Sequence, residues 1–139
     1  FTFNGVDFYD DYAHHPTEIK SVLEGVKKVF DKFERVCIFQ PHRISRLKDL
    51  RNEFAHCFRD ADTIILCPIF TAGEKIKLGF NYNDFAKEII KNSKVKLFMI
   101  KNNIELAKFL KQNIYGNKIV IGMGAGSISN WIKKLPELM

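Results

Sequence analysis

Short apolar runs alternate with amphipathic segments along the whole chain, and this alternation limits the folds that it can adopt. The apolar runs predict strands over 6–9, 35–39, 63–67, 95–100 and 118–121. Between them, apolar residues recur at spacings of three and four, which predicts helices over 16–33, 46–58, 82–91, 104–112 and 128–135. Strands that alternate with helices favour a parallel sheet covered on both faces. We therefore expect an α/β, Rossmann-like three-layer domain with a mostly parallel sheet of about five to six strands.

The length and composition favour one folded domain. The chain has 139 residues, of which 46% are hydrophobic and 27% charged, and this excludes a disordered or collagen-like protein. It contains no internal repeat and no long linker, so we expect residues 1–139 to form a single domain. No apolar run approaches the roughly 20 residues of a membrane helix, and no export leader opens the chain. Because the first residue is Phe1, we expect a fragment of a longer protein.

Charge and cysteine content give little support to two further classes of function, a nucleic-acid-binding module and a metal- or disulfide-stabilised protein. The net charge is +6, but the lysines are scattered over predicted helices, which is typical of solvated helix faces. No basic cluster interleaved with aromatic residues indicates a nucleic-acid partner. Cys37, Cys57 and Cys67 form no C-x-x-C pair, and two of them lie inside apolar runs. We interpret them as buried apolar residues and expect neither a metal site nor a disulfide framework.

Ligands of parallel α/β sheets bind where the strands end, so the segments after each predicted strand are the candidate sites. After the first strand, residues 10–16 read Asp-Asp-Tyr-Ala-His-His-Pro. The aspartates could bind ribose hydroxyls, magnesium or a cationic partner, and His14 and His15 could contact a substrate or ligate a metal. The alternative is a polar loop in which an Asp or a His caps the following helix. The density of reactive groups leads us to favour a functional role.

Two arginines follow the second strand. Arg43 and Arg46 are three residues apart, so we expect both to project from one side of the first helical turn. Guanidinium groups bind carboxylates and phosphates through two parallel hydrogen bonds. The alternative is that the two arginines form surface ion pairs with Asp49 or Glu53. The spacing favours neither anion binding nor surface ion pairs. After the third strand, Glu74 follows Gly73 and is either a ligand or a solvated carboxylate, and the spacing favours the second.

A glycine-rich segment, residues 122–127, follows the last predicted strand. It could form a backbone cradle for an anion, or it could allow close packing between strand and helix. A dinucleotide fingerprint would need a third glycine where Ser127 stands and an acidic residue about 20 positions later. The chain also lacks a phosphate-binding G-x-x-x-x-G-K-[ST] loop. A dinucleotide-binding module is therefore an alternative with little support.

Four segments resemble motifs of the Mur ligase family, in the group that adds L-alanine to UDP-N-acetylmuramate. Residues 10–19 resemble D-D-Y-[AG]-H-H-P-T-E-[IV], and residues 39–46 resemble F-Q-P-H-R-[YF]-[ST]-R, with Ile44 in place of the aromatic residue. Residues 72–74 and 124–128 resemble A-G-E and G-A-G-[SDN]-I. The motifs occur in the family's order, and the whole chain resembles only the C-terminal domain of these enzymes.

The resemblance implies a cytoplasmic, ATP-dependent ligase of peptidoglycan biosynthesis, in which ATP activates the carboxylate of UDP-N-acetylmuramate and the amine of L-alanine attacks it. It implies that ATP and Mg²⁺ are held mainly by a central domain of the same chain, and that central and N-terminal domains are the partners. The isolated fragment is then expected to be inactive. The implied nucleotide-binding residues are Asp10 and Asp11, and the implied alanine-binding residues are Tyr12, His14, Arg43 and Arg46. A murein-tripeptide ligase, which shares D-D-[FY]-A-H-H-P, is the alternative within the family.

Overall fold

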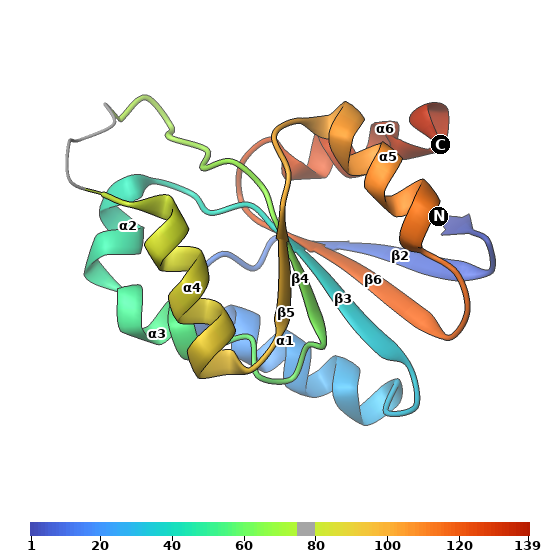
Figure 1. The fold of residues 1–139 in the computed structure, drawn as a ribbon, viewed down its shortest axis with the longest axis horizontal. Coiled ribbons are helices and arrows are strands. Elements are labelled where there is room, and N and C mark those ends of the chain that lie inside the picture. Colours follow the sequence, from blue (N-terminus) through green and yellow to red (C-terminus); the bar gives the residue numbers. More distant parts are fainter. Residues whose placement is uncertain (75–79) are drawn as a thin grey trace.

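The computed structural model describes residues 1–74 and 80–139, and these residues form a six-stranded sheet with helices on both faces (Figure 1). The strands are β1 (Thr2–Phe3), β2 (Val6–Asp11), β3 (Glu34–Phe39), β4 (Thr63–Leu66), β5 (Lys96–Met99) and β6 (Lys118–Met123). Their order across the sheet is β1-β2-β6-β3-β4-β5. Every neighbouring pair is parallel except β1 and β2, which are antiparallel. The expected α/β fold with a mostly parallel sheet is confirmed.

The helices lie in two layers. They are α1 (Pro16–Val29), α2 (Ile44–Asp49), α3 (Arg51–His56), α4 (Tyr82–Ser93), α5 (Asn103–Asn113) and α6 (Ile128–Leu138). Figure 1 shows α1, α3 and α4 on one side of the sheet and α5 and α6 on the other. The helices that follow β5 therefore cover the opposite face of the sheet from those before it. Strand β6 enters the middle of the sheet, between β2 and β3.

Side chains of the central strands alternate between two cores. On β3, Cys37 and Phe39 pack towards α1 and α3, whereas Val36 and Ile38 pack towards α5 and α6. Because successive side chains of a strand point to opposite faces, a strand buried on both faces must be apolar throughout. This explains the continuous apolar runs in the sequence. The expected burial of the cysteines is confirmed, and Cys37 and Cys67 are completely buried.

Several predicted boundaries were wrong. The helix expected over 46–58 is two short helices, because Leu50 takes a non-helical conformation between them. The helix expected to reach Phe33 ends at Val29. The strand β1 was not predicted. It pairs with β2 through a tight turn at Asn4 and Gly5, which both have positive φ, and the dipeptide Asn-Gly is a common signal for such a turn.

The carboxyl ends of five parallel strands lie level with one another. Asp11 is paired in register with Met123, Met123 with Phe39, Phe39 with Leu66, and Leu66 with Met99. The loops after β2, β3, β4 and β6 therefore leave the sheet at the same height. This register positions the candidate site.

Candidate functional site

The loop between β2 and α1 combines helix capping with exposed polar groups. His15 is the N-cap of α1, and its Nδ1 accepts a hydrogen bond from the backbone N–H of Thr17 at 3.2 Å. Glu18 completes a capping box by accepting from the backbone N–H of His15 at 3.1 Å. The capping alternative considered for this segment therefore holds for His15. Pro16 occupies the first helical turn, where its missing N–H costs nothing.

The neighbouring histidine is free of that capping role. His14 Nδ1 lies 2.9 Å from the carbonyl oxygen of Tyr12 and 3.7 Å from Glu18 Oε1. The rings of Tyr12 and His14 meet edge to face with centroids 5.3 Å apart, and Tyr12 is 71% exposed. The two rings form an aromatic pair at the end of β2, of which the phenol is the exposed member.

The loops after β3 and β4 are joined into one structure. The backbone N–H of Arg43 donates to the carbonyl of Phe70 at 2.8 Å, and the N–H of Phe70 donates to the carbonyl of Pro41 at 2.8 Å. The ring of Phe70 stacks on His42 with centroids 5.5 Å apart and an interplanar angle of 16°. Segments about 30 residues apart in the sequence thus hold each other at the sheet edge.

The expected geometry of the arginine pair needs a correction. Arg43 is the N-cap of α2 with φ of +69°, so it lies before the first helical turn rather than in it. Positive φ is unusual for a residue with a Cβ and here accompanies the bridge to Phe70. Arg46 lies inside α2, half-buried, with Nη1 3.4 Å from His42 Nδ1. Arg43 is exposed.

His42 is the point where these segments meet, although the sequence did not single it out as a site residue. The ring centroids of His42 and His14 lie 6.1 Å apart. This contact connects the β2–α1 loop to the β3–α2 loop. Burial lowers the pKa of His42, and the charges of Arg46, His14 and Arg43 lower it further, whereas Glu74 raises it. The structure therefore brings His14, Arg43 and Arg46 around one imidazole.

The glycine-rich segment after β6 serves close packing. Gly124 has φ of +150°, and a Cβ there would lie 2.8 Å from the carbonyl oxygen of Gln40. A Cβ at Gly126 would lie 2.6 Å from Cβ of Phe70. Gln40 is buried, donates to Ser127 Oγ at 2.9 Å and accepts from the backbone N–H of Ile128 at 2.9 Å. The amide at the start of α6 is therefore already bonded, which favours the packing interpretation over an anion cradle.

The two aspartates of the first motif make separate contacts. Asp11 Oδ1 accepts from the backbone N–H of Ala13 at 2.8 Å, which shapes the loop. Asp10 is exposed, and its Oδ2 accepts from Ser129 Oγ at 2.6 Å, which ties β2 to α6. Among residues 1–74 and 80–139 no group of three His, Cys, Asp or Glu side chains is arranged to hold a metal ion. No helix within these ranges is long and apolar enough to cross a membrane.

The amino-acid sequence has relatives among the curated proteins. The chain is 64% identical over 139 residues to the UDP-N-acetylmuramate–L-alanine ligase of Pelagibacter ubique, which covers all of this chain and 30% of that protein. It is 37% identical over 136 residues to the enzyme of the same name from Mesorhizobium japonicum, covering 98% of this chain and 29% of that protein. The chain thus spans about 30% of the length of the curated relatives it matches.

Solved structures show the same fold. The UDP-N-acetylmuramate–alanine ligase of Thermotoga maritima superimposes with a TM-score of 0.72 at 25% identity, covering 99% of this chain and 28% of that chain. A murein peptide ligase of Psychrobacter arcticus gives a TM-score of 0.75 at 17% identity over 99% of this chain and 28% of its own. The profile of the family described as "Mur ligase, glutamate ligase domain" matches residues 2–126. By this match, the chain belongs to the Mur ligase family and carries its glutamate ligase domain.

Proposed function

We propose that this chain is the C-terminal, substrate-binding domain of an ATP-dependent ligase that joins L-alanine to UDP-N-acetylmuramate in peptidoglycan biosynthesis. The observation that carries the proposal is the convergence of His14, Arg43 and Arg46 around His42 at the carboxyl edge of the sheet. The identity of 64% to a relative of that name supports the choice of reaction.

Recognition of alanine must depend on its charged groups, because its side chain is a single methyl. Arg43 and Arg46 supply guanidinium groups for its carboxylate, through charge-assisted hydrogen bonds. Tyr12 and His14 would lie beside the methyl group of alanine and exclude larger side chains, with only about 1–3 kcal/mol of discrimination per methylene. These four residues are the proposed alanine-binding residues.

Asp10 and Asp11 are the proposed nucleotide-facing residues, because they end β2 beside the same edge. Asp10 is the exposed member, and one of its oxygens is already held by Ser129. ATP supplies the energy of the reaction by phosphorylating the sugar carboxylate. Central and N-terminal domains of the same cytoplasmic protein are proposed to hold ATP and Mg²⁺, and this domain closes over them.

The alternative functions have less support. A murein-tripeptide ligase shares the first motif and the fold, but the segment Gln40–Arg43 has the form of the alanine-adding enzymes, and the curated relatives at 64% and 37% identity carry that name. A dinucleotide-binding module would need the glycine segment to be open to a ligand. Gly124 and Gly126 instead face Gln40 and Phe70 at distances too short for a Cβ.

The proposal is tested with the full-length protein that contains this chain, with ATP, Mg²⁺, UDP-N-acetylmuramate and L-alanine. We expect phosphate release that requires both acceptor and amino acid, and none from residues 1–139 alone, because the chain contains no phosphate-binding loop. His14→Ala and Arg46→Ala should lower kcat/KM for L-alanine about 10- to 100-fold, as expected for the loss of a hydrogen bond to a charged group.

The matched control is Lys108→Ala, which removes an exposed cation from α5 on the other face of the sheet. It should leave kcat/KM within about twofold, because an exposed charge distant from the site contributes little. Equal losses from all three variants would refute the assignment of the site, and turnover by the fragment alone would refute its dependence on the other domains.

A further inference from the structure

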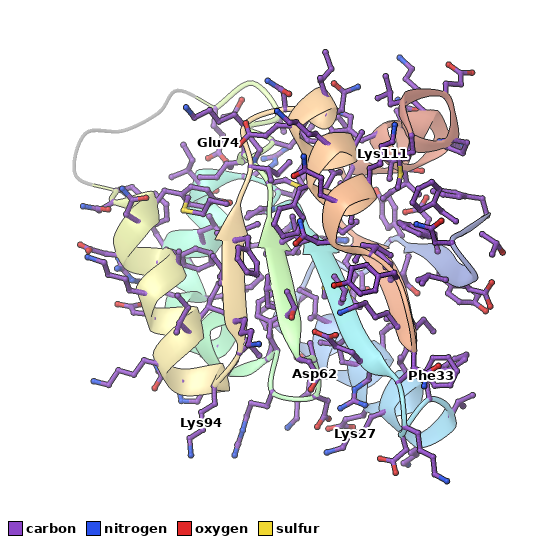
Figure 2. All side chains as sticks on the ribbon, turned by 45° about the vertical axis from the view of Figure 1, so that its right-hand side comes forward. Lys27, Phe33, Asp62, Glu74, Lys94 and Lys111 are labelled. Carbon is purple, nitrogen blue, oxygen red and sulfur yellow. The ribbon has the colours of Figure 1, made fainter. Side chains whose placement is uncertain are left out.

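Glu74 ends a strained turn at the edge of the sheet where the candidate site lies. Ala72 and Gly73 have φ of +53° and +85°, and the backbone N–H of Glu74 donates to the carbonyl of Thr71 at 3.0 Å. Ala72 is a residue with a Cβ in the left-handed region, which costs free energy. Figure 2 shows Glu74 at this edge, whereas Asp62 and Phe33 mark the opposite one. The turn that positions this carboxylate is therefore kept despite the conformational free energy that Ala72 costs.

One oxygen of this carboxylate is buried without a donor. Within residues 1–74 and 80–139, Glu74 Oε1 is shielded from solvent and accepts no hydrogen bond. A buried acceptor that has lost water and gained no partner destabilises the protein. A ligand that brings its own N–H groups would remove that cost on binding.

The turn that carries Glu74 begins directly after Phe70, whose ring stacks on His42 and whose carbonyl accepts the backbone N–H of Arg43. The carboxylate is therefore tied to the same loops as the cluster around His42. Its charge raises the pKa of His42, whereas Arg46, His14 and Arg43 lower it, so all four groups act on one imidazole. Two guanidinium groups and one carboxylate together make a dipolar site. A free α-amino acid at neutral pH has the complementary pattern, with a carboxylate and an ammonium group on the same carbon.

We propose that Glu74 binds the α-ammonium group of the incoming amino acid while Arg43 and Arg46 bind its carboxylate. This proposal rests on the proposed function and assigns the amino-acid site a residue that recognises the amine. Among the cations that a carboxylate could take, a divalent metal fits less well. It needs several oxygen ligands, which the described residues do not group together, and the two arginines would repel it.

The test uses Glu74→Gln in the full-length ligase, because glutamine keeps the size of the side chain and removes its charge. We expect the KM for L-alanine to rise about tenfold or more, the loss expected for a hydrogen bond between charged groups. The KM for ATP and that for UDP-N-acetylmuramate should stay within about twofold. Glu74→Asp should recover part of the lost affinity. The matched control is Glu24→Gln, which neutralises an exposed carboxylate on α1.

Inhibition by propionate separates amine recognition from a structural role. Propionate has the carboxylate of alanine and lacks its ammonium group, so its inhibition constant should be unchanged by Glu74→Gln and raised by Arg46→Ala. Equal weakening of alanine and propionate would show that Glu74 only shapes the loop and would overturn the proposal. An unchanged KM for alanine, or a change confined to the Mg²⁺ requirement, would overturn it too. If the unmutated ligase does not respond to L-alanine at all, the proposed function itself has failed.

Discussion

At the scale of single residues, the environment of His42 decides its protonation. The ring is stacked on Phe70 and lies beside Arg46, so the imidazolium form would lose water and meet a like charge. Burial is the first cause of its lowered pKa, and the charges of Arg46, His14 and Arg43 follow. A neutral imidazole is therefore favoured at pH 7, where it can accept a hydrogen bond from a neighbouring guanidinium.

This environment predicts the titration of His42. Its midpoint, followed by NMR of the ring Cε1–H, should lie below the value of about 6.5 typical of an unperturbed histidine. Because the unfolded chain then binds the proton more tightly, His42 should reduce the stability of the fold as the pH falls from about 6.5 through the folded midpoint.

Two substitutions test the causes of the shift. Arg46→Gln should raise the midpoint, since it removes a repelling charge, and Glu74→Gln should lower it further, since it removes an attracting one. A midpoint at or above the unperturbed value in the unmutated chain would contradict the arrangement of charges described here.

Residue types and spacing identified part of the site. The reactive residues after β2 and the two arginines after β3 were recognisable because the carboxyl ends of parallel strands are the usual place for ligands. The roles of Gln40 and Phe70 were missed, because they depend on partners far away in the sequence, such as Ser127. For Gln40 the only available signal was a polar residue directly after a fully apolar strand.

At the scale of elements, close packing of the turn before α6 against the loop after β4 supports the site. Gly126 lies against Phe70, and Phe70 in turn stacks on His42. The absence of a side chain at Gly126 therefore leaves room for the Phe70 ring in the position where it stacks on His42. The packing interpretation of the glycine segment was one of the two that the sequence left open.

Gly126→Ala tests this contact. The added methyl would overlap the root of the Phe70 side chain, which cannot move without its backbone, so we expect a loss of about 1–3 kcal/mol in the free energy of unfolding of residues 1–139. Urea denaturation measures it.

The control is Gly25→Ala, inside α1, where a Cβ would meet nothing within 4 Å. Alanine suits a helix interior better than glycine, so this variant should gain about 0.5–1 kcal/mol. Equal effects of the two substitutions would contradict the account of packing at Gly126.

At the scale of the whole molecule, one sheet separates two cores and couples them. Phe54 on α3 lies in the core beneath α1 and α4, and Trp131 on α6 packs against the core on the other face. Neighbouring residues of β3 and β4 belong to opposite cores, so neither core can be lost without distorting the strands that the other needs. Such a domain is expected to unfold in a single transition.

The single tryptophan makes this testable. Phe54→Ala should lower the free energy of unfolding by about 3–5 kcal/mol, because it leaves a cavity in a fully buried position. The fluorescence of Trp131, on the opposite face, should report the same shift in urea midpoint as far-UV circular dichroism. A fluorescence midpoint unmoved by Phe54→Ala would show that the two cores unfold independently.

The sequence by itself determined the class of fold and the candidate segments, because burial on both faces of a parallel sheet leaves a local pattern in each strand and helix. Only the tertiary structure decided which of those residues lie together. The level strand ends brought His14 and Arg46 to His42, and the fold made His15 a helix cap and placed the Glu74 turn directly after Phe70, which stacks on His42. These relations depend on strand order and register, which are set by packing between distant segments and leave no periodic trace along the chain.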